Sequence, residues 1–196
     1  TCDGTPTDCV MLGFYEILKN RKPDLLISGI NMGENLANDI TYSGTVCAAL
    51  EGALRNIKSI ALSKIMPKNK SKDHWSSIDK YLKKIILNIL DSKINKNHFL
   101  NINFPNTHYK NINDIKITSL SKRKPMGKFL SRKDAKNIPY FWLTTDRYSS
   151  NIHKIDSDIW AVDNNYISIS PLNTSMSEIK NLCIYKEQFD KNKRSR

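Results

Sequence analysis

The sequence predicts an α/β fold: a doubly wound, mostly parallel sheet, with an extended β-hairpin and a C-terminal helix. Short apolar runs alternate with helical patterns as far as Phe104, which is the rhythm of a parallel sheet. The run Leu25–Ile27 is continuously apolar, as in a strand that is buried on both faces. Beyond Phe104, two strand patterns follow one another without a helix between them, which favours a hairpin.

The first helix begins at Thr5-Pro6-Thr7-Asp8, where Thr5 can cap, Pro6 suits the first position and Asp8 favours the helix dipole. Its apolar stripe continues to Leu18, and we expect it to end near Asn20. The elements expected next are a strand at 24–28, a helix at 45–55, a strand at 60–63, an amphipathic helix at 76–91 and a strand at 99–104.

Two strands expected at 112–120 and 140–144 would form the hairpin around a basic segment that contains Pro125 and Gly127. The last elements expected are a short helical turn at 159–162 with Asp158 as its cap, a strand at 166–170 and a helix at 177–189. The predicted organisation is an α/β core over 1–110, an extended hairpin over 111–150, and a return to the core over 151–196, ending in a helix with a basic tail.

The chain has 196 residues and a formal net charge of +12, which would attract nucleic acids or phosphorylated metabolites. The basic residues are dispersed, however, and lack interleaved aromatics, so we expect no dedicated nucleic-acid site. The basic clusters at 64–72, 122–136 and 191–196 are interpreted as loops or a solvated end. Four cysteines without a CxxC pair make zinc improbable and favour a cytoplasmic protein with reduced thiols. No apolar run reaches the ~20 residues that a membrane helix needs.

The segment Ser28–Asn35, followed by Tyr42–Thr45, carries the chemistry of the chain. It leaves a buried strand and leads into an Ala-rich helix, and open α/β sheets bind ligands at such carboxyl ends. The side-chain oxygen of Asn31 could bind Mg²⁺ or Mn²⁺. The alternative is that Asn31 only braces the turn through its own backbone.

Asn35 could donate its amide to a phosphate, or again brace the loop. Ser43-Gly44-Thr45 places two hydroxyls and a flexible amide at a helix start, where a phosphate can bind. Simple capping by Ser43 or Thr45 would need no ligand. The histidines are scattered and none pairs with a Ser or Cys at the spacing of a nucleophile, which argues against a Ser/His/Asp triad; the sequence contains neither a P-loop nor a GxGxxG fingerprint.

These motifs resemble the SurE family of phosphatases, which act on nucleoside monophosphates. The strongest matches are Gly4–Val10, Ser28–Asn35 and Tyr42–Thr45, and weaker echoes are Asn101–Pro105, Asp158–Val162 and Tyr166–Leu172. The resemblance implies a Rossmann-like core whose hairpin pairs subunits into a homodimer or homotetramer. It also implies a divalent metal, Mg or Mn, with Asn31 as a ligand. Asn35, Ser43, Gly44 and Thr45 would hold the phosphate, with Asn35 and Ser43 in catalytic roles.

The same resemblance implies a strand ending in Asp-Asp-Gly, with two carboxylate ligands, and we expect this segment upstream of Thr1. Ser175 stands near the place where the family usually has an Asp. Asn31 alone offers one neutral oxygen, whereas Mg²⁺ sites generally use one or two carboxylates.

The leading hypothesis is therefore a metal-dependent phosphatase for nucleoside 5′-monophosphates, with 3′-nucleotides and short polyphosphate as further substrates. The alternative is a phosphate- or nucleotide-binding module without catalysis, because the charged metal ligands are absent from these residues. A nucleic-acid-binding protein is a third reading, and it rests on the net charge alone.

Overall fold

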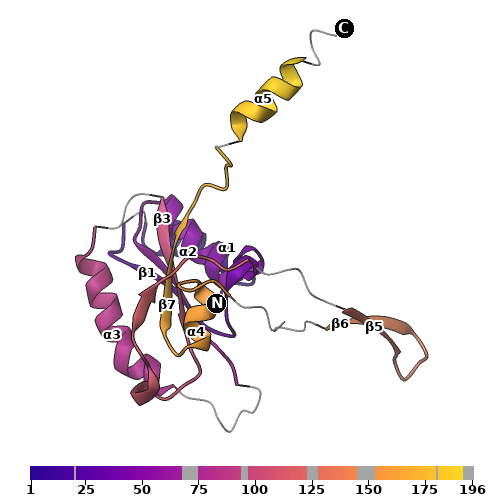
Figure 1. Cartoon of the computed structure of the whole chain (residues 1–196), viewed down its shortest axis with the longest axis horizontal. Helices are drawn as coiled ribbons and strands as arrows, with labels where there is room; N and C mark the ends of the chain where they lie inside the picture. Colours follow the sequence, from indigo (N-terminus) through magenta and orange to yellow (C-terminus); the bar gives the residue numbers. More distant parts are fainter. Residues whose placement is uncertain are drawn as a thin grey trace.

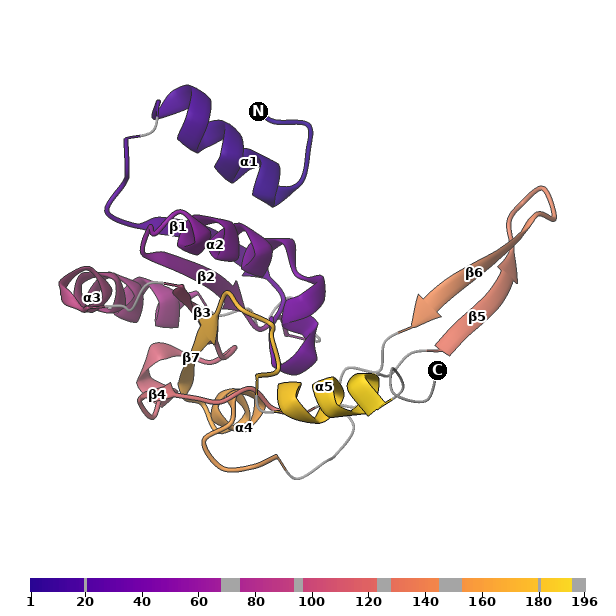
Figure 2. The same cartoon turned by 90° about the horizontal axis from the view of Figure 1, so that it is seen from above.

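A computed structural model describes residues 1–19, 21–67, 75–93, 97–122, 128–144, 153–179 and 181–191. These residues form an α/β body from which a two-stranded arm and a C-terminal helix project in different directions (Figures 1 and 2). The predicted helix end at Asn20, the basic segment at 123–127 and the tail from 192 onward lie outside the described residues, as does the 68–72 part of the first basic cluster.

The central sheet has five strands in the order β1-β2-β3-β7-β4. Its first three strands run parallel, β7 is antiparallel to β3, and β4 is parallel to β7. The predicted α/β fold with a mostly parallel sheet is confirmed. The strands are β1 (Leu26–Met32), β2 (Ser59–Lys64), β3 (His98–Phe104), β4 (Ile115–Ile117) and β7 (Ile167–Asn173).

Helices cover both faces of the sheet (Figure 2). α1 (Pro6–Leu12) and α2 (Gly44–Leu54) lie on one side, and α3 (Ser76–Asp91) lies on the other. Alternate residues of β2 serve the two faces: Ile60 and Leu62 join the core cluster under α3, whereas Ala61 joins the cluster under α2. The doubly wound arrangement therefore follows from a central strand that is apolar on both sides.

The first helix begins as the sequence predicts. Thr5 occupies the N-cap and accepts a hydrogen bond from the Asp8 N–H, while Asp8 accepts from the backbone of Thr5. This reciprocal pair is a capping box. Beyond α1 the chain continues into a π-helical turn, η1 (Gly13–Ile17).

The arm consists of β5 (Lys128–Lys133) and β6 (Pro139–Thr144), which pair antiparallel. The prediction that 112–120 pairs with 140–144 is wrong. Part of that segment forms β4 in the main sheet, where Ile115 and Ile117 pair with β7. The physical reason lies in Ile115, which pairs with the buried Ile167 and packs against the main core cluster, whereas Ile117 stays exposed.

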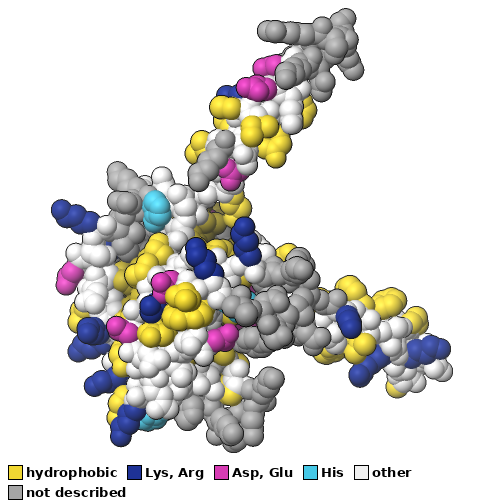
Figure 3. Space-filling view, in the orientation of Figure 1, with side chains coloured by type: hydrophobic (Ala, Val, Ile, Leu, Met, Phe, Trp, Pro, Cys, Tyr) yellow, Lys and Arg dark blue, Asp and Glu magenta, His cyan; other side chains and the backbone are white. Residues whose placement is uncertain are grey.

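Hydrophobic side chains are exposed along the arm and on α5 (Leu182–Lys191), and both projections carry them in Figure 3. Those of the arm are Phe129, Leu130, Ile138, Tyr140, Phe141, Trp142 and Leu143. Those of α5 are Leu182, Ile184, Tyr185 and Phe189. The helix begins later than predicted, at Leu182 rather than Ser177.

Two further predictions need correction. Lys64 is not part of a solvated loop: it ends β2 with a fully buried side chain, 5.1 Å from the ring of Trp75. In α4 (Asp158–Asp163) the N-cap is Ser157, and Asp158 is the first helical residue. The remaining short elements are η2 (Ala37–Tyr42) and η4 (Tyr109–Asn111).

Candidate functional site

Polar side chains meet at the carboxyl ends of β1, β2 and β3. Asn31 pairs in register with Ser63, and Ser63 pairs with Asn103, so the three residues form a row across the parallel strands. β1 extends farther than predicted, since it continues through Asn31 to Met32. This is the sheet edge at which α/β proteins bind ligands.

Gly29 allows β1 to approach β2 just before that row. Its φ of +118° is a conformation that only glycine adopts readily. A Cβ at this position would lie 2.3 Å from the carbonyl oxygen of Leu62. The pairing register also shifts between Ser28 and Asn31. The glycine of the Ser-Gly-Ile-Asn motif is thus required by backbone packing.

Asn31 is half-buried, and its amide nitrogen Nδ2 donates to the carbonyl of Gly33 at 3.0 Å. This hydrogen bond braces the turn, which is the role that we considered as the alternative to metal binding. It engages the nitrogen end of the side chain. The oxygen Oδ1 is therefore the atom that Asn31 can present to a cation.

Asn35 lies inside the protein, with 5% of its surface exposed. Its Nδ2 donates to Ser63 Oγ at 2.7 Å, and its backbone N–H donates to Asn103 Oδ1 at 2.9 Å. Its carbonyl accepts from Asn101 Nδ2 at 2.8 Å and from Asn103 Nδ2 at 3.0 Å. Three side chains of the sheet therefore fix the position of this one loop residue.

Ser43 caps α2, because its Oγ accepts a hydrogen bond from the Val46 N–H at 3.2 Å. Gly44 and Thr45 form the first turn, and the first N–H groups of a helix have no partner within it. The positive end of the helix dipole lies at the same place. The half-buried Ser43-Gly44-Thr45 segment can thus receive an anion.

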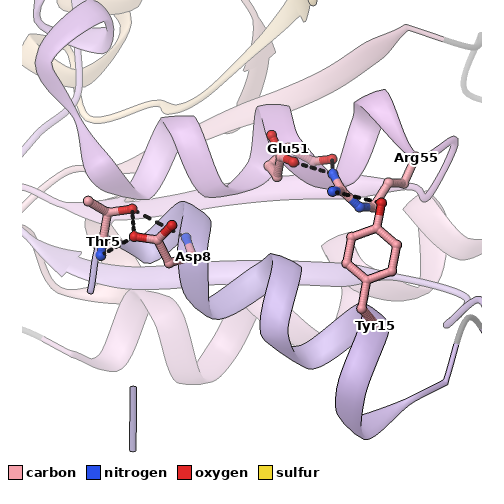
Figure 4. A network of polar contacts seen from close by, with 5 residues as sticks. All are labelled: Thr5, Asp8, Tyr15, Glu51 and Arg55. Atoms are coloured by element: carbon pink, nitrogen blue, oxygen red, sulfur yellow. Dashed lines mark hydrogen bonds and ion pairs between the residues drawn. The ribbon is translucent and has the colours of Figure 1, made fainter. Parts of the chain in front are cut away.

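α1 and α2 lie side by side and run in the same direction (Figure 4). Near their starts, a Cβ on Gly44 would lie 2.9 Å from Pro6 Cγ, so only glycine fits this contact. At their far ends, Arg55 is paired with Glu51 and donates to the Tyr15 hydroxyl at 3.5 Å. Both helices therefore direct their N-termini toward the edge that holds Asn31.

Two carboxylates, one at the start of α1 and one that interacts with Glu34, have shifted pKa values. Hydrogen bonds from the hydroxyl and the backbone N–H of Thr5 hold the pKa of Asp8 below its ordinary value. Burial raises the pKa of Asp163, with a further increase from Glu34 and an opposing effect from His153. Within the part of the chain that the structure describes, no three His, Cys, Asp or Glu residues are placed to hold a metal ion. These residues alone do not fit a divalent cation, for which Asn31 offers one neutral oxygen.

The structure thus places the predicted site residues in two groups. Asn31 and Ser43–Thr45 belong to the sheet edge and the helix start, whereas Asn35 is buried behind them. The sequence patterns did not identify four residues that bind the loop by hydrogen bonds. Three of them bind Asn35 and the fourth binds Ala37: Ser63, Asn101, Asn103 and Asp158. The sequence predicts a strand around Asn101 and Asn103 and a helix cap at Asp158, and the resemblance adds weak matches at Asn101–Pro105 and Asp158–Val162, but neither predicts a contact with the loop.

Residues 1–126 match the family described as Survival protein SurE. The chain is 39% identical over 178 residues to a 5′-nucleotidase SurE from Aquifex aeolicus, covering 91% of this chain and 69% of the relative. It is 41% identical over 172 residues to a 5′-nucleotidase SurE from Campylobacter jejuni, covering 87% of this chain and 66% of the relative. The chain therefore spans about two thirds of the length of these relatives.

A solved structure supports the same relationship. The crystal structure of the SurE protein from Aquifex aeolicus superposes with a TM-score of 0.80 at 38% identity. The match covers 95% of this chain and 73% of that chain. Among the described residues, no helix is long and apolar enough to cross a membrane.

Proposed function

Because the chain belongs to the survival protein SurE family, we propose that it is a metal-dependent phosphatase that hydrolyses nucleoside 5′-monophosphates. Curated relatives named 5′-nucleotidase SurE, at 39%, 39% and 36% identity, support a 5′-nucleotidase. Activity on 3′-nucleotides and short polyphosphate is part of the same proposal. The observation that carries it is the placement of Asn31 and the first turn of α2 at one sheet edge.

The phosphate would bind at the start of α2. Its oxygens would accept hydrogen bonds from the backbone N–H groups of Gly44 and Thr45 and from the hydroxyls of Ser43 and Thr45. The helix dipole adds a favourable field for an anion. Donors held by a rigid helix also stabilise the charge that builds up on the phosphoryl oxygens during the reaction.

Asn35 would donate a hydrogen bond to the phosphoryl group from its buried position in the loop. Its side chain is buried, and the hydrogen bond to Ser63 uses one of its two amide hydrogens. The second amide hydrogen would be donated to the phosphoryl group. The side chains of Asn101 and Asn103, which are hydrogen-bonded to the backbone of Asn35, would keep that hydrogen in place during the reaction.

We propose Mg²⁺ or Mn²⁺ as the cofactor, with Asn31 Oδ1 as one ligand. The chemistry that such an ion would supply at this edge is that of a Lewis acid for the phosphoryl group. The described residues supply too few charged donors to hold it alone. This shortage favours the second candidate function, a module that binds phosphate or nucleotide without catalysis.

Phosphate release from AMP by the full-length protein separates the two functions. We expect release that requires added Mn²⁺ or Mg²⁺ and stops on chelation, with 3′-AMP and short polyphosphate assayed alongside. Calorimetric binding of AMP that is unchanged by metal, together with no phosphate release, would support the binding module instead. Binding of DNA or RNA that vanishes at ~200 mM salt and shows no sequence preference would be explained by the net charge alone.

We propose that the protein assembles as a homodimer or homotetramer through the arm. A two-stranded hairpin is marginally stable by itself, and this one exposes aromatic residues such as Phe129, Phe141 and Trp142. Phe129 and Phe141 meet edge to face, with ring centroids 6.5 Å apart. Light scattering should give the mass of an oligomer, and replacing Phe141 and Trp142 by serine should lower it. We also propose a cytoplasmic location, because all four cysteines are free thiols.

A further inference from the structure

We infer that Asp158 is a positioning residue for the site loop, residues 33–43, which it ties to the segment that precedes the arm in the sequence. The inference rests on the proposed function, since the loop carries Asn35 and ends at Ser43. Asp158 lies in α4, more than a hundred residues beyond the loop, and its side chain is fully buried. It touches neither Asn31 nor the start of α2 through any hydrogen bond seen among the described residues.

The carboxylate of Asp158 bridges two distant segments. Oδ2 accepts the backbone N–H of Ala37 in the site loop at 2.7 Å. Oδ1 accepts the backbone N–H of Ser121 at 2.7 Å and that of Ile159 at 2.8 Å. Ser121 precedes β5, so it belongs to the segment that leads into the arm. One side chain therefore joins the site loop to Ser121, in the segment that precedes the arm.

Ala37 is the point at which the loop needs this support. It is fully buried, and its φ of +51° lies in the left-handed region that alanine seldom adopts. Apolar packing reinforces the carboxylate, since Leu36 and Ala37 form a buried cluster with Ile159 and Val162 of α4. The surroundings thus impose a backbone conformation that the sequence alone disfavours.

The site loop is held at two places along its length. The sheet fixes its first part, because the Gly33 N–H donates to the carbonyl of Lys64 and Asn35 is held by β2 and β3. Asp158 fixes its second part at Ala37, where η2 begins. η2 then leads directly to Ser43, the N-cap of α2. A shift at Ala37 is therefore passed on to the phosphate-binding turn.

An asparagine cannot replace this carboxylate, although it has the same shape. Its oxygen could accept from only one side, and its NH₂ group would face a second N–H donor, that of Ala37 or Ser121. Two N–H groups cannot bond to each other, so one buried donor would lose its acceptor. The Asp158→Asn variant thus tests the bridge with almost no change in volume.

The matched control is Asp156→Asn. Asp156 is two residues away, but its side chain is 59% exposed and accepts from Lys116 Nζ at 2.8 Å. The Asp156→Asn substitution removes one negative charge, as Asp158→Asn does, at a side chain that does not contact the site loop. We expect Asp158→Asn to lower kcat/KM for AMP on the order of 10²-fold per folded molecule, with kcat lowered and KM raised. The Asp156→Asn variant should stay within about twofold of the unchanged protein.

Amide hydrogen exchange gives a readout that needs no catalysis. In the unchanged protein the N–H groups of Ala37 and Ser121 should both exchange far more slowly than amides of exposed loops. In Asp158→Asn at least one of them should exchange tenfold faster or more. Unchanged kcat, KM and exchange in a folded Asp158→Asn variant would overturn the inference, and so would equal losses in the control.

If Asp158→Asn does not fold, amide hydrogen exchange in the unchanged protein tests the inference instead. Rapid exchange of the Ala37 N–H would then overturn it. The outcome also separates the two proposals. Protection at Ala37 that is lost in Asp158→Asn, in a protein that releases no phosphate from AMP, would reject the proposed function. The bridge itself would then stand.

Discussion

Asn103 and Asn101 offer a sharp test of how the sheet holds the site loop. Both are fully buried, lie two residues apart on β3 and donate to the same atom, the carbonyl oxygen of Asn35. Asn103 also accepts the Asn35 N–H at 2.9 Å. By contrast, Asn101 Oδ1 is buried and has no partner among the described residues. Replacing each by leucine, which has the same branching, should therefore give different losses.

In Asn103→Leu, the buried Asn35 N–H loses its acceptor, which costs about 1–3 kcal/mol, and a second hydrogen bond of about 0.5–1.5 kcal/mol is lost. The expected loss of unfolding free energy is roughly 2–4 kcal/mol. In Asn101→Leu the Asn35 carbonyl keeps its bond from Asn103, and an unpaired polar oxygen disappears from the core. That loss should be about 0–1 kcal/mol.

Urea unfolding followed by tryptophan fluorescence measures the difference directly, and the slope with urea should stay the same in both variants. A difference of about 2 kcal/mol corresponds to roughly 4–8 °C in Tm for a chain of this length. Equal losses, or a larger loss in Asn101→Leu, would refute the assignment of these bonds. Activity should follow the same order, because Asn103 alone binds the loop through two bonds.

Two further predictions concern α1 and its contact with α2. Gly44→Ala would bring a Cβ within 2.9 Å of Pro6 Cγ, so α1 must move and we expect a loss of about 1–3 kcal/mol with reduced kcat/KM. Gly13→Ala is the control, since no atom lies within 4 Å of its added Cβ, and thermal unfolding should show unchanged or slightly raised stability. The pKa of Asp8 is lowered by its bonds with Thr5, so its contribution to stability is present above the ordinary pKa of about 3.9 and is lost as the pH falls through the lower folded value. In Asp8→Asn the acid unfolding curve should lack the loss of stability that Asp8 contributes. An acid unfolding curve identical to that of the unchanged protein would contradict this prediction.

Local patterns predicted the regular elements well. The capping pattern at Thr5 gave the start of α1, and the apolar stripe gave α3, predicted at 76–91 and found as Ser76–Asp91. Both signals lie within one element, where side-chain spacing and backbone geometry are directly linked. The arm was placed less accurately, because an exposed strand such as β5 has no buried face to impose an apolar alternation.

The site was predicted only where its residues are close in sequence. Asn31 and Ser43–Thr45 stand in one motif-rich segment, and the strand-to-helix rule brings them to the same edge. The burial of Asn35 depends on Ser63, Asn101 and Asn103 from other strands. The bridge from Asp158 to Ala37 joins residues 121 positions apart. Such contacts are set by tertiary packing, which single-sequence patterns do not report.

The rate of phosphate release from AMP in Asn31→Ala, relative to Asn113→Ala, tests most directly whether this sheet edge is the active site. The two residues are matched, because the Nδ2 of each donates to one backbone carbonyl, that of Gly33 at 3.0 Å and that of Asn164 at 2.8 Å. We predict that, with Mn²⁺ present, Asn31→Ala loses at least tenfold in kcat/KM while Asn113→Ala keeps the activity of the unchanged protein. Equal activity of the two variants would contradict the assignment of the site.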